Sequence, residues 1–332
     1  MSALAALTGF ADGPPIEPST GVIERIGAFG AALGVDAMGL LTERAAIWSY
    51  ARNGRTSCGG ATRLMKTADG WIALSLTRAD DEDLVPAWIG CDPDWSVVEA
   101  TVCTRPAAEL VERGRLLGLP LAVLGERPPA GPTQAHLIAE AAPLGRPLLV
   151  VDLSSLWAGP LCTRLLRETG ARVVKVESRT RPDGARNGPA GFFELMHAGK
   201  EFESIEFTRE ALVELLLSAD VVVEGSRPRA LEQLGIDVSD VVAHGPRVWL
   251  SITGHGRAEP ERNWVGFGDD AAVAGGLVAW WRGEPCFMGD AIADPLTGMA
   301  GAVAVLDALR RGGRWLIDCN LAGVAAYVAA GQ

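Results

Sequence analysis

Lysine and cysteine are both scarce in this sequence, and neither residue clusters. Of the 30 basic residues, only Lys66, Lys175 and Lys200 are lysines. The 41 acidic residues outnumber them and give a net charge of -11, which disfavours a broad nucleic-acid or anionic-membrane surface. The six cysteines include no Cys-x-x-Cys pair and no Cys/His spacing typical of zinc. We therefore expect no metal site and a reducing compartment.

Long apolar runs are also missing. The longest apolar stretches, 271–281 and 321–331, are too short to span a bilayer, and the N-terminus lacks the basic region of a secretion signal. These features predict a cytoplasmic protein without a membrane segment. The length of 332 residues, with 48% hydrophobic residues, suggests about two folded domains.

The second half alternates short apolar runs with helical patterns. The runs are continuous and rich in β-branched residues, as in strands that are covered on both faces. They predict an α/β fold with a doubly wound, mostly parallel, Rossmann-like sheet. The expected strands are 148–153, 172–177, 220–224, 248–253 and 315–318.

The first half predicts a second, smaller α+β domain. Residues 64–66 and 71–76 flank an Ala-Asp-Gly turn and read as a hairpin, and 105–117 reads as a helix. A run of Pro and Gly at 125–132 is typical of a linker. The predicted division is a helical segment 1–50, a small α+β domain with a glycine loop at 51–127, a linker 128–146 and the Rossmann-like domain 147–332.

A five-residue pattern occurs twice. EPSTG from Glu17 and DPLTG from Asp294 each precede an apolar helix rich in small residues, expected at 23–33 and 299–309. The recurrence suggests that the segment 1–50 is the remnant of an internal repeat.

Arginines gather after two of the predicted strands. The turn after the first strand has no Gly-x-Gly-x-x-Gly pattern and carries Trp157, which argues against a nicotinamide or flavin dinucleotide. Arginine suits phosphate groups, so the clusters indicate a polyanionic ligand. The alternative is a solvated loop with salt bridges to Asp183 or Glu232. The clustered residues are Arg179, Arg181, Arg186, Arg227 and Arg229.

Asp294 allows two interpretations. It precedes Pro295 and an apolar helix, so it could cap that helix through backbone N–H groups. It could also be an ionised carboxylate that attacks an acyl carbon. Gly59 and Gly60 permit either an ordinary turn or a loop that approaches a ligand closely. Cys58 lacks a neighbouring His to activate it, and His197 reads as a surface residue with a weaker claim to catalysis.

Several of these patterns together resemble the motifs of the family III CoA-transferases. That family is typified by formyl-CoA:oxalate CoA-transferase and also contains the 2-methylacyl-CoA racemases. The matching motifs are VVDLSSLWAGP from Val150, HAGK from His197, ADVVVEGSRPR from Ala219, SITGHGR from Ser251 and DAIADPLTG from Asp290. The stretch SCGGATRLMKTADGWIAL from Ser57 resembles the small domain of the family.

The resemblance implies that CoA moves from an acyl-CoA donor to a carboxylic acid through a covalent intermediate on Asp294. It further implies that Gly59 and Gly60 close over the nucleophile, that Trp157, Ala158 and the clustered arginines hold coenzyme A, and that the protein is a homodimer. The two domains occur in inverted order relative to the family, and Glu17 would be the counterpart of Asp294. The alternatives are a 2-methylacyl-CoA racemase, disfavoured because Gly268 rather than a base precedes Asp269, and an inactive acyl-CoA-binding homologue.

Overall fold

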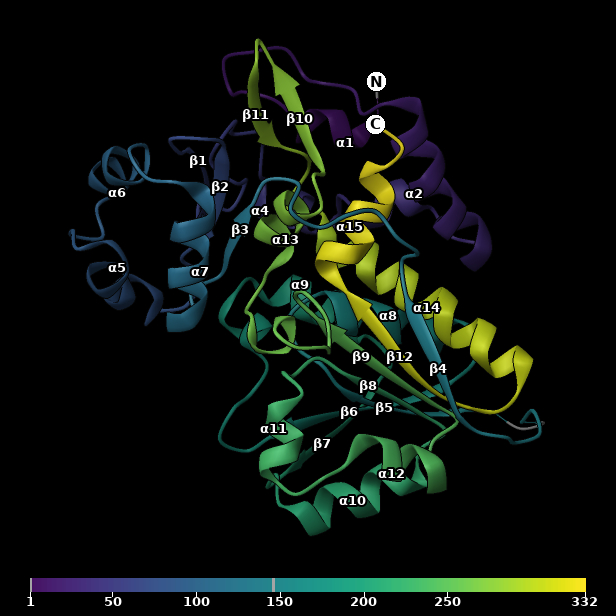
Figure 1. The fold of residues 1–332 in the computed structure, drawn as a ribbon. Coiled ribbons are helices and arrows are strands. Elements are labelled where there is room, and N and C mark those ends of the chain that lie inside the picture. Colours follow the sequence, from purple (N-terminus) through teal and green to yellow (C-terminus); the bar gives the residue numbers. More distant parts are fainter. Residues whose placement is uncertain (1, 145–146) are drawn as a thin grey trace.

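A seven-stranded sheet forms the centre of the larger lobe in the computed structural model, which describes residues 2–144 and 147–332 (Figure 1). Six strands are parallel in the order β7-β6-β5-β8-β9-β12, and β4 pairs antiparallel with β12. The parallel part has the 3-2-1-4-5-6 order of doubly wound sheets, which confirms the predicted fold class. The strands are β4 (Gln134–Ala139), β5 (Leu149–Leu153), β6 (Arg172–Ser178), β7 (Glu201–Ile205), β8 (Val221–Glu224), β9 (Val248–Thr253) and β12 (Arg314–Asn320).

Helices cover both faces of this sheet (Figure 1). Val150 of β5 packs in the core that contains α8 (Ala158–Glu168) and α14 (Ala293–Arg311), and the next residue, Val151, packs in the core under α10 (Arg209–Ser218) and α12 (Val238–His244). Both residues are fully buried. Because alternate side chains of a strand point to opposite faces, this arrangement accounts for the continuous apolar runs in the sequence.

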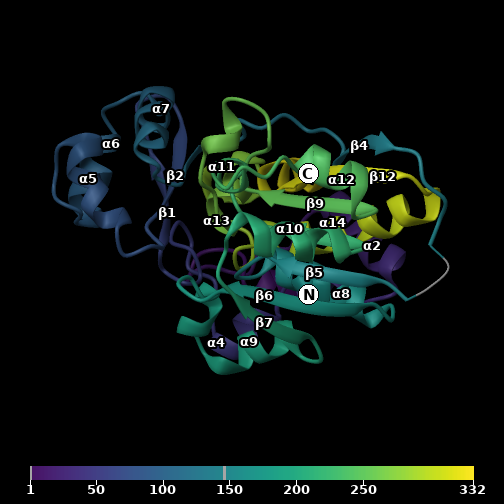
Figure 2. The same cartoon turned by 90° about the horizontal axis from the view of Figure 1, so that it is seen from below.

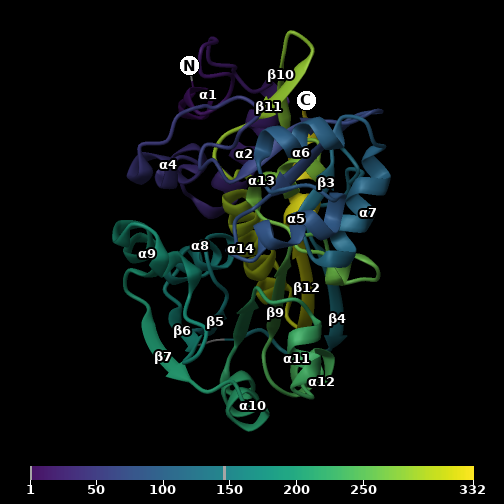
Figure 3. The same ribbon diagram turned by 90° about the vertical axis from the view of Figure 1, so that its left-hand side faces the viewer.

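The smaller lobe lies to one side of the sheet (Figure 2). Strands β1 (Thr62–Lys66) and β2 (Trp71–Ser75) form the expected hairpin, and β3 (Leu121–Val123) extends it. Three helices complete the lobe, namely α5 (Asp81–Ile89), α6 (Trp95–Val102) and α7 (Ala107–Leu117). Figure 3 shows this lobe toward the viewer, where β2 and β3 contact α13 (Gly268–Ala274) of the larger lobe.

The N-terminal segment is helical and belongs to the larger core. Val22 and Ile26 of α2 (Thr20–Leu33) are fully buried in the core that also holds α14. Glu17 is exposed and accepts a hydrogen bond from the Ser2 N–H at 2.9 Å, so it does not share the buried environment of Asp294. The remaining helices here are α1 (Ala3–Ala6), α3 (Ala37–Leu40) and α4 (Glu43–Trp48).

Part of the predicted linker is a strand of the main sheet. β4 lies within 128–146, so the prediction of a linker there is wrong for residues 134–139, and residues 145–146 lie outside the described residues. β4 is an edge strand and mostly exposed, and therefore lacks the apolar run that marks a buried strand. β7, at the opposite edge, was missed for the same reason.

The other elements lie around the carboxyl edge of the sheet and at the end of the chain. Strands β10 and β11 form a hairpin that projects at the top of Figure 1. No helix of the described residues has the length and apolar character needed to cross a membrane. These elements are α9 (Ala190–His197), α11 (Arg229–Gln233), β10 (Val278–Trp281), β11 (Glu284–Phe287), α15 (Leu321–Ala329) and the 3-10 turns Gly184–Asn187 and Glu261–Asn263.

A glycine contact sets the distance between α8 and α14. A Cβ built on Gly298 would lie 2.7 Å from the Ala158 carbonyl oxygen, whereas one built on Gly27 of α2 would meet nothing within 4 Å. We expect Gly298→Ala to lower the free energy of unfolding by about 1–3 kcal/mol. The control Gly27→Ala should leave it unchanged or raise it by up to about 1 kcal/mol. Urea unfolding of both variants checks this, and equal effects would contradict the proposed close contact.

Candidate active site

A cavity of about 580 Å³ lies at the carboxyl ends of β5, β8 and β9, where doubly wound sheets bind ligands. Asp294 and Ala158 line it together with three of the predicted arginines. The structure therefore brings the predicted nucleophile and part of the predicted anion site into one space. The arginines in the wall are Arg181, Arg227 and Arg229, with Arg78 from the smaller lobe and Arg262 beside them.

Asp294 does not cap its helix. Ile292 occupies the N-cap position of α14 and no side chain caps the helix, while Asp294 lies in the first turn with its own N–H bonded to the Ala291 carbonyl at 2.9 Å. The interpretation of Asp294 as an N-cap is thus wrong. Its carboxylate instead reaches the cavity from a partly buried position.

Gly268 makes room for the carboxylate. A Cβ built at this position would lie 2.5 Å from Asp294 Oδ2 and even closer to the Ala291 carbonyl oxygen. Any larger residue would displace Asp294 or the turn before α14. The position that lacks a base in the sequence is therefore also one that leaves no space for a side chain.

Two further aspartates on α13 surround Asp294. Asp269 accepts a hydrogen bond from the Ala291 N–H at 3.0 Å, and Asp270 accepts one from the Ser75 hydroxyl at 2.7 Å. Burial raises the pKa of Asp269 to about 6 and that of Asp270 to about 7. Among the described residues, no group of three or more His, Cys, Asp or Glu is arranged to hold a metal ion.

The pKa of Asp294 is raised to about 7, and the main cause is burial. The Arg44 guanidinium opposes this effect, and the nearby charges of Asp269, Asp270 and Asp290 add to it. The carboxylate is thus close to half ionised near neutral pH. An anion in such a setting is poorly solvated, which favours its attack on an electrophile.

Arg44 and Asp290 were not identified from the sequence. Arg44 of α4 donates to Asp290 through Nε at 2.8 Å and through a second nitrogen at 2.5 Å, while Asp290 is fully buried just before α14. The two residues are 246 positions apart, and although Asp290 opens the motif DAIADPLTG, Arg44 lies in no recognisable motif. Only the packing of the N-terminal segment on the larger lobe reveals the pair.

Three arginines of the cavity have no hydrogen-bond or ion-pair partner for their side chains among residues 2–144 and 147–332. They are Arg181, Arg227 and Arg229. Burial and the charges of Arg229 and Arg78 lower the pKa of Arg227, as expected for cations that crowd together without an anion. The alternative partners are taken, because Glu232 pairs with Arg262 and Asp183 with Lys175. Uncompensated cations of this kind suit a polyphosphate.

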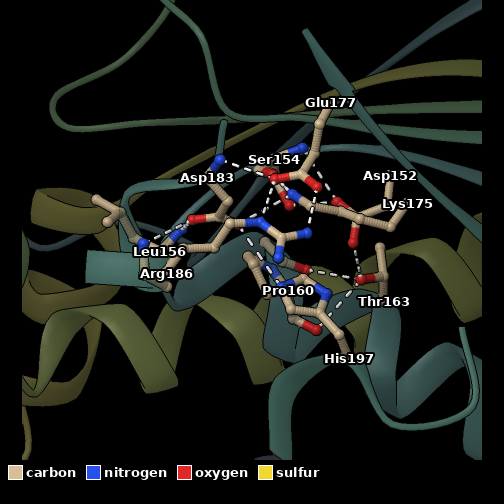
Figure 4. Close-up of polar contacts among 12 residues, drawn as sticks. Asp152, Ser154, Leu156, Pro160, Thr163, Lys175, Glu177, Asp183, Arg186 and His197 are labelled. Atoms are coloured by element: carbon tan, nitrogen blue, oxygen red, sulfur yellow. Dashed lines mark hydrogen bonds and ion pairs between the residues drawn. The ribbon is translucent and has the colours of Figure 1, made fainter. Parts of the chain in front are cut away.

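A buried polar network holds the loop that follows β5 (Figure 4). Asp183 accepts a hydrogen bond from the Leu156 N–H at 2.9 Å and pairs with Lys175 at 3.0 Å. Asp152 pairs with Lys200 at 3.0 Å on the other side of the loop. Leu156 has a φ of 70°, a strained value for a residue with a side chain, and it lines the cavity. The network therefore fixes one wall of the site.

Three predicted ligand contacts lie elsewhere. Trp157 is 1% exposed and stacks against Arg44 rather than lining the cavity. Arg186 pairs with Glu177 through two nitrogens, at 3.0 and 2.6 Å, and Arg179 is also absent from the cavity wall. The assignment of these three side chains to the ligand is therefore corrected. Trp157 packs in the core, Arg186 is neutralised by Glu177, and Arg179 is exposed at the surface.

His197 also differs from its prediction as a surface residue. It is 3% exposed, and its Nδ1 lies 3.2 Å from the Lys200 ammonium group. Burial lowers its pKa. It is part of the network that supports the loop.

The loop that contains Gly59 and Gly60 is held near the aspartates by hydrogen bonds from the residues that flank it. The Cys58 thiol donates to the Gly289 carbonyl at 3.4 Å, and the Thr62 hydroxyl donates to Asp269 at 3.4 Å. Gly59 and Gly60 lie between these anchors but do not line the cavity described above. Burial raises the pKa of Cys58 to about 12, which leaves its thiol protonated and argues against a nucleophilic role.

Comparisons with known proteins identify the family of this chain. Residues 147–332 match the family model described as CoA-transferase family III. A succinyl-CoA:mesaconate CoA-transferase of Haloarcula hispanica is 32% identical over 184 residues, which are 49% of this chain and 46% of that protein. A formyl-CoA:oxalate CoA-transferase of Escherichia coli is 29% identical over 177 residues, which are 48% of this chain and 42% of that protein.

Solved structures also resemble part of this chain. A CAIB/BAIF family protein from Brucella suis has a TM-score of 0.52 and 31% identity, with 56% of this chain and 55% of the other covered. A hypothetical protein from Mycobacterium tuberculosis has a TM-score of 0.52 and 27% identity, with 58% and 59% covered. The chain thus spans less than half the length of the curated relatives named above and little more than half of these solved chains.

The raised pKa of Asp294 predicts a pH-dependent cost to stability. Folding favours the protonated acid, so its stabilising effect is complete below the ordinary pKa and is lost as the pH rises toward 7. We expect Asp294→Asn to raise the free energy of unfolding by about 1 kcal/mol or more at pH 8 and to change it little at pH 4.5. Asp307→Asn, on an exposed face of the same helix, is the control and should show no such pH dependence. A pH-independent effect of the Asp294 change would contradict the burial of this charge.

Proposed function

Because the chain belongs to CoA-transferase family III, we propose that it transfers CoA from an acyl-CoA donor to a carboxylic acid through a covalent intermediate on Asp294. The observation that carries the proposal is the shared cavity, whose wall contains a carboxylate that caps nothing and three guanidinium groups that have no partner among the described residues. An acyl-CoA substrate needs both features, because the carboxylate can attack its thioester and the guanidinium groups can bind its phosphates. The homodimer implied by the resemblance stays a prediction.

In the first step, an Asp294 oxygen attacks the thioester carbonyl carbon. The C–S bond breaks, CoA leaves as a thiolate, and the acyl group forms a mixed anhydride with Asp294. The thiolate then attacks the Asp294 carbonyl carbon, which expels the donor acid and leaves an aspartyl-CoA thioester. The acceptor carboxylate then attacks the carbonyl carbon of aspartyl-CoA and expels the CoA thiolate, which gives a second mixed anhydride. The thiolate attacks the acceptor's acyl carbon in this anhydride, so the new acyl-CoA departs and the Asp294 carboxylate is restored.

The residues in the walls of the cavity would bind the substrate and position it. Arg227 and Arg229 at the end of β8 would hold phosphate groups, and Arg78 of the smaller lobe lines the same cavity while paired with Asp81. The network behind Leu156 keeps the loop after β5 in place. The smaller lobe thus takes part in substrate binding as well as in covering the site.

The glycine loop would exclude water, which would otherwise hydrolyse the anhydride. A developing oxyanion needs backbone donors, each worth about 3 kcal/mol. The Gly60 N–H already bonds the Ser57 carbonyl at 2.9 Å, so the Gly59 N–H is the better donor. We therefore place Gly59 nearest the reacting carbonyl when the loop closes.

Racemisation of a 2-methylacyl-CoA is the alternative within the family. It requires a base that removes the C2 proton, and Gly268 has neither a side chain nor the space for one. An inactive acyl-CoA-binding protein would share the arginines but would not require an uncapped Asp294. The two observations favour transfer.

Asp294→Asn tests the nucleophile. After incubation with an acyl-CoA, intact-protein mass spectrometry should show an acyl or CoA adduct on the wild-type chain that hydroxylamine removes. The variant should form no adduct and lose CoA exchange by at least 1,000-fold, while Asp307→Asn should behave as wild type. Undiminished exchange in Asp294→Asn would refute the assignment. Deuterium uptake at C2 without an acceptor acid would favour the racemase.

Arg227→Gln and Arg229→Gln test the anion site. Each change removes a charge-assisted contact, so each should weaken CoA binding about tenfold or more, with the loss shrinking at high salt. Isothermal titration with CoA measures this without reference to activity. Arg172→Gln is the control, because Arg172 pairs with Glu201 on the surface at the other end of β6. Equal affinity in all three variants would contradict the proposed phosphate contacts.

A further inference from the structure

Arg44 is held rigidly beside the first turn of α14. Two of its nitrogens bond the fully buried Asp290 carboxylate, at 2.8 and 2.5 Å. Its guanidinium also lies 4.8 Å from the centre of the Trp157 ring, in cation–π contact. The guanidinium is therefore fixed both in its plane and across its face.

The three elements that meet at Arg44 also position Asp294. Trp157 precedes α8, and the adjacent Ala158 carbonyl packs against α14 at Gly298, one turn after Asp294. Asp290 lies one turn before it, and the backbone between them is fixed by the bond from the Ala291 N–H to Asp269. A fixed cation thus lies at the junction from which the nucleophile projects.

We propose that Arg44 is a positioning residue for the reaction, which keeps the Asp294 carboxylate ionised and aimed at the thioester although other carboxylates crowd it. This inference rests on the proposed function of Asp294 and deepens it. It assigns the N-terminal helical segment, which lies outside the family match at 147–332, a direct part in the chemistry of the larger lobe.

The charges around Asp294 show why a cation is needed. Asp269 and Asp270 face it from α13 and Asp290 from the preceding turn, and all three disfavour its anion. Arg44, from α4, is the cation that opposes them. Cys58 and Tyr50 lie beside Arg44 and Asp290, and both are neutral near pH 7 because burial raises the pKa of each. Without Arg44, the Asp294 anion would lose the cation that opposes the charges of Asp269, Asp270 and Asp290.

Trp157 fits this assignment. The side chain lies at the start of α8, next to a residue of the cavity wall, yet it is buried against Arg44 and against Phe192, with ring centres 5.5 Å apart. It fixes the guanidinium instead of contacting the substrate. The large aromatic residue in this turn is explained by a contact that sequence patterns did not indicate.

Arg44→Gln tests the proposal through the pH profile of Asp294 acylation. In single-turnover mixing with acyl-CoA, the wild-type rate should rise with pH as Asp294 ionises. Loss of the cation should move the midpoint up by about one pH unit or more. The variant should be about eightfold slower or more at pH 6.5 and should approach the wild-type rate above pH 9. Arg44→Lys, which keeps the charge without the bidentate fork, should fall between the two.

Arg63→Gln is the matched control. Arg63 also pairs with a carboxylate, Glu99 at 3.1 Å, and also lies 4.8 Å from the centre of a tryptophan ring, that of Trp95. It lies in β1 on the smaller lobe, so its loss should leave the pH midpoint unchanged. A loss of rate in Arg44→Gln that is equal at every pH would overturn the proposal and leave Arg44 a purely structural role.

A second measurement separates this inference from the proposed function. The stabilisation by Asp294→Asn at high pH reports the ionisation of Asp294 without any substrate. In the Arg44→Gln background this stabilisation should begin at a higher pH than in the wild type. The same onset in both backgrounds would refute the role of Arg44, even if Asp294 forms a covalent adduct. A shifted onset without any adduct in the wild type would refute the proposed function alone.

Discussion

The arrangement of this protein depends on a partly buried carboxylate at the start of α14 that has no hydrogen-bonded partner among the described residues. Within that part of the chain, Asp294 neither caps the helix nor forms an ion pair, and burial raises its pKa to about 7. Three other carboxylates crowd the same turn, and one guanidinium compensates them. A charge in such surroundings costs stability. Its presence at the carboxyl end of a parallel sheet fits the reactive role that we propose for it.

The close contact of α8 with α14 makes this position available. Gly298 allows the Ala158 carbonyl to approach the helix, and Gly268 leaves room for Asp294 itself. Both glycines matter because a side chain would separate elements that must touch. Asp294 and the loop after β5 consequently line the same cavity. Behind that wall, the pairs of Lys175 with Asp183 and of Lys200 with Asp152 hold the backbone in place.

The site contains two groups of charged residues, the arginines of the cavity and the aspartates around the first turn of α14. The chain carries a net charge of -11, yet Arg181, Arg227 and Arg229 face the cavity unpaired. These cations suit the phosphates of an incoming ligand, while the aspartates around the first turn of α14 are kept apart from them at the inner end. The N-terminal helices complete the core of the larger lobe and bring Arg44 to Asp290.

The sequence alone was sufficient for the doubly wound sheet, because buried parallel strands leave continuous apolar runs. It also singled out Asp294, Ala158 and the arginines after β8, which the structure places along one cavity, because they lie in motifs that resemble those of the family. It missed β4 and β7, whose exposed edges carry no such runs. It also placed Trp157, Arg179 and Arg186 on the ligand, since a motif fixes a residue along the chain but not the direction of its side chain. Only the tertiary structure decided those directions, as well as the pairing of Arg44 with Asp290. Partners that are 246 residues apart meet through packing, and local patterns do not record packing.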